Sequence, residues 1–106
     1  MTLLLLIATL NAPLGSTDAP RVPGAIAMED PGRYRSPRGY DDTIEYYKRV
    51  FRSQGGVRWR NIINLPGIRA KHLQNLRSRS NWEGINIYEH RGETYFYIIA
   101  KTPRRK

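Results

Sequence analysis

Tyrosine and arginine side chains alternate with other residues in three stretches of this chain. Tyr88, Tyr95 and Tyr97 lie in two of these stretches, and Arg58 and Arg60 lie in an earlier one. Residues two apart on a strand share a face. If the stretches are strands of one sheet, they form a flat aromatic surface edged with positive charge. Such surfaces bind nucleic acids through base stacking and phosphate contacts, and they also bind sugars and proteins.

A structural explanation of the same residues stays open, because tyrosine favours strands and cross-strand aromatic pairs. The sequence also lacks the glycine and aromatic spacing of an RNA-recognition sheet.

The two histidines, His72 and His90, are the remaining candidates for chemistry. A ribonuclease needs a base, an acid and a cation around the scissile phosphate. His90 precedes Glu93 by three positions with Arg91 between them, so we add His90 to the candidate binding residues. An exposed pair at a strand end explains the same residues, and a small basic ribonuclease is our third-ranked function.

Metal and cofactor chemistry find no support in the sequence. The chain has no Cys, and two histidines without a carboxylate at ligand spacing make a weak metal site. We predict no catalytic residue, no metal and no cofactor.

The charge balance points to an anionic partner. Eighteen Lys and Arg face nine Asp and Glu, a formal net charge of +9, and fourteen of the eighteen are Arg. Guanidinium groups match phosphate and carboxylate geometry, and a basic surface attracts polyanions at long range. The alternative is that the arginine content reflects codon bias and solubility.

The strands that would position the tyrosines are expected near the C-terminus. Residues 85–90 and 93–101 alternate in hydrophobicity around Arg91-Gly92, which predicts a β-hairpin. The apolar face of this hairpin then pairs Ile85 with Ile98 and Ile87 with Phe96, and its other face carries the tyrosines.

A helix is expected to cover that apolar face. Apolar residues recur at helical spacing over residues 41–53, and Gly55-Gly56 follows as a stop. Asp41 or Asp42 with Glu45 is expected to cap its start.

Before the hairpin, residues 57–63 read as a strand that places Val57, Trp59 and Ile63 opposite the two arginines. Residues 68–76 suit either a short helix or a strand.

The N-terminus resembles an export signal. Residues 3–10 are apolar apart from Thr9, a length typical of a signal-peptide core and too short for a bilayer span of about 20 residues. No Lys or Arg precedes them, which counts against the signal. We predict an exported protein, periplasmic or secreted. In the alternative, the run belongs to the fold of a cytoplasmic protein.

These observations predict an α+β domain with one helix packed on a three- or four-stranded antiparallel sheet, after a disordered N-terminal segment. We expect residues 40–106 to fold alone. The expected division is a signal-like leader at 1–19, a Pro-rich linker at 20–39, the domain at 40–101 and a basic tail at 102–106.

Four short motifs carry a resemblance. They are Pro23-Gly24-Ala25, Tyr34-Arg35-Ser36-Pro37, the run from Gly39 to Tyr47, and Trp59-Arg60. Together they resemble small exported proteins of unassigned function in Gram-negative bacteria. The resemblance spans about residues 22–101 and implies export, but it implies no active site.

The sequence therefore favours a small basic exported binding or accessory domain without enzymatic activity. Its partner would be an anionic polymer or an acidic protein. The second hypothesis is an intracellular nucleic-acid-binding protein. The sequence makes no prediction about the oligomeric state.

Overall fold

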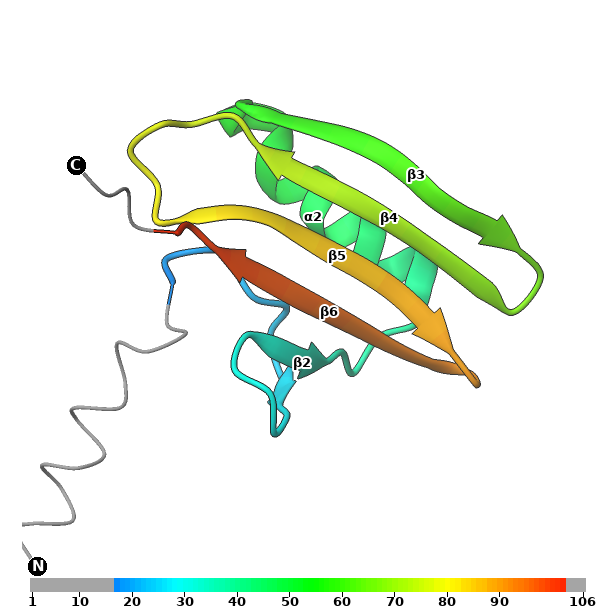
Figure 1. The fold of residues 1–106 in the computed structure, drawn as a ribbon. Coiled ribbons are helices and arrows are strands. Elements are labelled where there is room, and N and C mark those ends of the chain that lie inside the picture. Colours follow the sequence, from blue (N-terminus) through cyan, green and yellow to red (C-terminus); the bar gives the residue numbers. More distant parts are fainter. Residues whose placement is uncertain (1–16, 103–106) are drawn as a thin grey trace, which may run out of the picture.

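One helix lies against one face of a six-stranded antiparallel sheet in the computed structural model, which describes residues 17–102 (Figure 1). The predicted α+β class is confirmed, but the sheet is larger than the three or four strands expected. Most of the predicted leader and tail, residues 1–16 and 103–106, lies outside the described residues. In chain order the elements are β1 (Ile26–Ala27), β2 (Arg33–Arg35), α2 (Tyr40–Gln54), β3 (Val57–Leu65), β4 (Ile68–Asn75), β5 (Trp82–His90) and β6 (Glu93–Ala100).

The sheet order is β1-β2-β6-β5-β4-β3. The predicted hairpin forms its centre, and its register is as expected: Ile87 pairs with Phe96 and Ile85 with Ile98. The turn residues Arg91 and Gly92 have φ values of 53° and 78°. Two consecutive positive φ angles are typical of the tight turn that matches strand twist, so this turn fixes the register.

The segment predicted as a disordered linker, residues 20–39, is part of the fold instead. It contains β1 and β2, and β2 pairs with β6. Val22 is buried, and the ring of Tyr34 stacks on Phe96 with centroids 5.2 Å apart. Its prolines lie outside the two strands, so they do not interrupt the pairing.

The helix α2 confirms the predicted helix, but its cap differs from the prediction. Gly39, which has no side chain to cap the helix, occupies the cap position. The hydroxyl groups of Ser36 and Thr43, both buried, lie 2.8 Å apart and tie the preceding loop to the first turn. Asp41 instead accepts a hydrogen bond from Arg69 on β4. At the other end, the N–H of Gly55 bonds to the carbonyl of Phe51, as the predicted glycine stop requires.

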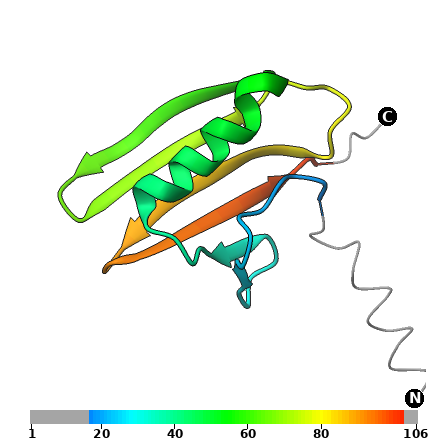
Figure 2. The ribbon, with the colours of Figure 1, turned by 180° about the vertical axis from the view of Figure 1, so that it is seen from behind.

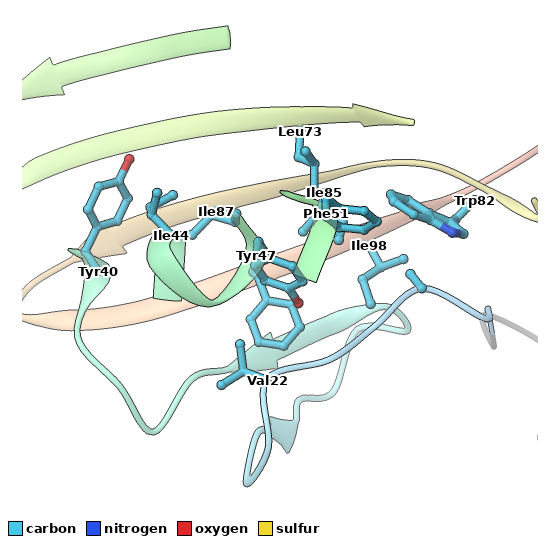
Figure 3. Packing of buried hydrophobic residues seen from close by; sticks show 12 residues of the cluster. Val22, Tyr40, Ile44, Tyr47, Phe51, Leu73, Trp82, Ile85, Ile87 and Ile98 are labelled. Atoms are coloured by element: carbon cyan, nitrogen blue, oxygen red, sulfur yellow. The ribbon is translucent and has the colours of Figure 1, made fainter. Parts of the chain in front are cut away.

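The core lies between α2 and the sheet (Figure 3). Tyr47 projects from the middle of the helix, is fully buried, and donates a hydrogen bond from its hydroxyl to the carbonyl of Pro20 at 2.9 Å. Burial raises the pKa of this phenol far above its usual value. The core thus joins the helix, the hairpin and the segment around Val22.

The pairing of β3 with β4 contains a bulge that changes one predicted position. Asn61 pairs with Lys71 and Ile63 pairs with Ala70, so Ile62 is an extra residue on β3. The extra residue shifts the alternation by one. Ile63 therefore lies on the face opposite Val57 and Trp59, not on their face as predicted. The ambiguous residues 68–76 form β4, which ends at Asn75.

Candidate functional site

One face of the sheet, which we call the open face, carries the predicted binding residues. Figure 1 shows this face toward the viewer, and Figure 2 shows α2 on the opposite side. Within residues 17–102, the helix packs on β5 and β6 from that opposite side, and no other helix is present to cover the open face.

A central row of side chains crosses this face from β3 to β2. The cross-strand register joins Arg60 to His72, His72 to Asn86, Asn86 to Tyr97, and Tyr97 to Arg33. Because paired residues lie on the same face of a sheet, the row has an arginine at each end and polar or aromatic groups between.

A second row runs beside it. Its members, also joined by register, are Ile63, Ala70, Tyr88, Tyr95 and Arg35.

The predicted residues thus come together. Arg58, Arg60, Tyr88, Tyr95 and Tyr97 share the open face. His90 lies at its edge, where β5 ends and His90 pairs with Glu93.

Sequence reasoning missed two arginines of this face, Arg33 and Arg35. The alternation of Arg33 and Arg35 around Tyr34 was the available signal, but the surrounding prolines led us to assign that stretch to a linker.

The tyrosine rings of this face are already in contact with neighbours. Tyr88 and Tyr95 stack on each other with centroids 5.4 Å apart and planes 21° apart. The guanidinium of Arg33 lies 5.8 Å from the centroid of Tyr97. Burial raises the pKa of Tyr88 above the usual value of a phenol. Fewer free ring faces remain for stacking bases than the sequence alone suggested.

The arginines of this face are mostly available to a ligand. Arg33 forms a long, half-exposed ion pair with Asp30 at 3.6 Å. Among residues 17–102, the side chains of Arg35, Arg58 and Arg60 form no ion pair, and all three residues are exposed. Three of the four guanidinium groups can therefore meet an anion without first losing a carboxylate partner.

His72 is held in a fixed orientation at the centre of the face. Its Nδ1 lies 2.6 Å from Oδ1 of Asn86, and its ring lies over Gly84. A Cβ at position 84 would lie 2.7 Å from both Cε1 of His72 and the carbonyl oxygen of Leu73, so this close approach requires glycine. The orientation leaves His72 beside Arg60.

Two shallow hollows mark the open face. One, of about 410 Å³, is polar and includes Arg60, His72, Gln74 and Lys101 in its lining. The other, of about 380 Å³, is mostly apolar and lies among Ile62, Ile63, Ile68, Tyr88 and Tyr97. Both volumes lie in the range that holds small ligands or parts of larger ones.

The geometry does not assemble a general acid and base for ribonuclease chemistry from the histidines. His72 pairs with Asn86, which precedes His90 by four residues on β5. At about 3.3 Å per residue, the two rings are separated by roughly 13 Å along the strand. Lys71 is adjacent to His72 and therefore lies on the other face.

In the described part of the chain, no group of three or more side chains could hold a metal ion, and no helix is long and apolar enough to cross a membrane.

Comparison with known proteins gave no match: no protein-family model, curated protein or solved structure is significantly similar to this chain. The resemblance to small exported proteins therefore stays a prediction.

Proposed function

We propose that this protein is a small exported binding domain, without enzymatic activity, that holds an anionic partner on its open face. The observation that supports this most directly is that Arg35, Arg58 and Arg60 share one face and have no carboxylate partners among the described residues. Guanidinium groups bind carboxylate, sulfate and phosphate through paired hydrogen bonds. The partner is thus a surface that bears such anionic groups.

The proposal is tested by heparin affinity, with heparin as a soluble polyanion probe. Arg58→Gln/Arg60→Gln should elute at clearly lower salt than the unchanged protein, because both side chains lie on the proposed contact face. The control, Arg49→Gln/Arg79→Gln, removes the same charge from exposed residues of the helix and a loop. Equal elution of the two variants would show that net charge, and not the open face, sets the affinity.

If the protein is exported, the contacts of residues 18–22 limit where its leader can be cleaved. Ala19 and Val22 are in the core, and the N–H of Asp18 bonds to Oδ1 of Asn81 at 3.0 Å. We therefore expect cleavage at or before Thr17, earlier than the predicted leader end at residue 19. Intact mass of the protein recovered from the periplasm or medium of a Gram-negative host measures this. Full-length protein confined to the cytosol would contradict export.

The alternative function is intracellular binding of nucleic acid, which the aromatic content of the open face favours. This alternative predicts that the protein binds RNA in a salt-dependent way. Tyr88→Ala should then weaken RNA binding more than Tyr46→Ala does, because Tyr46 lies on the helix side. The contact between Tyr88 and Tyr95 and the cover of Arg33 over Tyr97 make this alternative the weaker one. A ribonuclease ranks third because of the separated histidines.

A further inference from the structure

An uncharged apolar hairpin end projects from the sheet. Residues 62–68, which we call the β3–β4 tip, read Ile-Ile-Asn-Leu-Pro-Gly-Ile. Ile62, Ile63, Leu65 and Ile68 are 51%, 40%, 60% and 50% exposed. Both ribbon views show the tip extending past the start of α2 at the free edge of the sheet (Figures 1 and 2). A cluster of exposed aliphatic side chains of this kind marks an interaction site, whereas scattered ones do not.

The apolar surface continues from the tip onto the open face. Ile62, Ile63 and Ile68 also line the 380 Å³ hollow, which reaches Tyr88 and Tyr97. The proposed anion-binding face and the tip are thus one continuous surface, apolar at one end and basic at the other.

The strands behind the tip carry positive charge only. From Val57 to Trp82 the sequence has no acidic residue and six Arg or Lys. Arg60 on β3 precedes the tip, and Arg69 and Lys71 on β4 follow it. Arg69 is paired with Asp41 and Glu89, which leaves Arg60 as the guanidinium group of β3 nearest the tip, and Arg60 has no ion pair among the described residues.

The apolar tip and the acid-free strands behind it together indicate which partner binds the tip. A second copy of this chain would bring another formal charge of +9 and place two acid-free strand pairs side by side, which repels. An anionic lipid surface offers both complements at once: hydrocarbon below the headgroups for the isoleucines and leucine, and phosphate for the arginines.

We propose that the β3–β4 tip inserts into the surface of an anionic lipid bilayer while the basic side chains of β3 contact its headgroups. This deepens the proposed function, on which it rests, by naming the anionic partner as a lipid surface. The tip has no long apolar helix and no span, so its attachment is peripheral and reversible.

The test is co-sedimentation of the full chain with vesicles of equimolar phosphatidylcholine and phosphatidylglycerol, compared with phosphatidylcholine alone. Leu65→Asn should lower affinity for the anionic vesicles roughly tenfold, the size expected when one leucine side chain no longer enters hydrocarbon. Leu76→Asn is the matched control, because Leu76 is also half exposed but lies at the other end of β4. Thermal unfolding of both variants checks that the fold is kept.

A second measurement reports insertion directly. Leu65→Trp should show a blue-shifted emission with anionic vesicles relative to the unchanged protein, and Leu76→Trp should not.

Four outcomes would overturn the inference, and they differ in what they say of the proposed function. In the first, Leu65→Asn and Leu76→Asn bind vesicles equally while Arg58→Gln/Arg60→Gln loses binding. That result would show that the open face binds the vesicles by charge alone. Absence of vesicle binding with open-face-dependent heparin binding would leave a soluble anionic partner. A dimer in solution that Leu65→Asn dissociates would make the tip an interface between copies. If the unchanged protein bound neither heparin nor anionic vesicles, the proposed function would be refuted as well.

Discussion

At the residue scale, Arg69 connects three elements. Its Nε and Nη2 donate hydrogen bonds to the carboxylate of Glu89 on β5 at 2.9 and 3.1 Å, and its Nη1 donates to Asp41 on α2 at 3.0 Å. The guanidinium also lies 4.4 Å from the ring centroid of Tyr40. Arg69 thus holds the start of the helix against the sheet.

The pKa of Glu89 gives this cluster a pH dependence. Hydrogen bonds from Arg69 hold the pKa of Glu89 below its ordinary value, against the opposing effect of burial. A carboxyl whose pKa is lower in the folded state stabilises the fold above its unfolded-state pKa, and loses that contribution as the pH falls through its folded-state pKa. We therefore expect Glu89→Gln to lower the free energy of unfolding at neutral pH.

Chemical denaturation at two pH values measures this effect. The difference between Glu89→Gln and the unchanged protein should shrink once the pH is below the folded-state pKa of Glu89. Glu45→Gln is the control, because the Glu45–Arg52 pair lies exposed on the helix surface at 3.5 Å. A constant difference at both pH values would show that the carboxylate charge does not stabilise this cluster.

This cluster could not be predicted from the sequence. Arg69 and Lys71 occupy the helix-side face of β4, where apolar residues are expected. They hide the period-two pattern of that strand, and only the pairing with β5 places Arg69 beside Glu89.

At the element scale, the hairpin of β5 and β6 is the part that the sequence predicts best. Its alternation is regular, and the two-residue turn at Arg91-Gly92 leaves a single register that buries the apolar face. The candidate tyrosines follow from the same register. The positions of Arg33 and Arg35 do not follow from that register, because they depend on the pairing of a three-residue strand with β6.

The bulge at Ile62 is also absent from the sequence pattern. One extra residue turned Ile63 toward the open face, where it joins the apolar hollow.

The segment around β1 and β2 changes our expectation for the fragment 40–106. That fragment lacks the buried Val22, the stacking of Tyr34 on Phe96 and the hydrogen bond to Tyr47. We now expect it to be less stable than the full chain by more than about 2 kcal/mol, the scale of losing one large buried apolar contact.

Urea unfolding tests this expectation. Fragment 17–106 is the reference, because it keeps every described contact of this N-terminal segment. Equal stability of fragments 40–106 and 17–106 would show that the N-terminal segment adds nothing to the fold.

At the scale of the whole molecule, the two faces of the sheet carry different kinds of side chain. One face packs against α2 and makes the core, and the other collects arginine, tyrosine and polar groups. The formal charge of +9 is spread over both sides, including Lys48 and Arg49 on the helix. Net charge alone would attract polyanions to any basic surface, whereas we assign polyanion binding to the open face.

The most direct test of that assignment is to map the bound surface by amide chemical shifts. The ¹⁵N-labelled full chain is titrated with a short heparin oligosaccharide. We predict that the largest shifts fall on the open-face strands, at Arg58, Arg60 and Tyr97 among others. Shifts confined to the outer surface of α2 or to residues 102–106 would contradict the assignment of the open face as the binding surface.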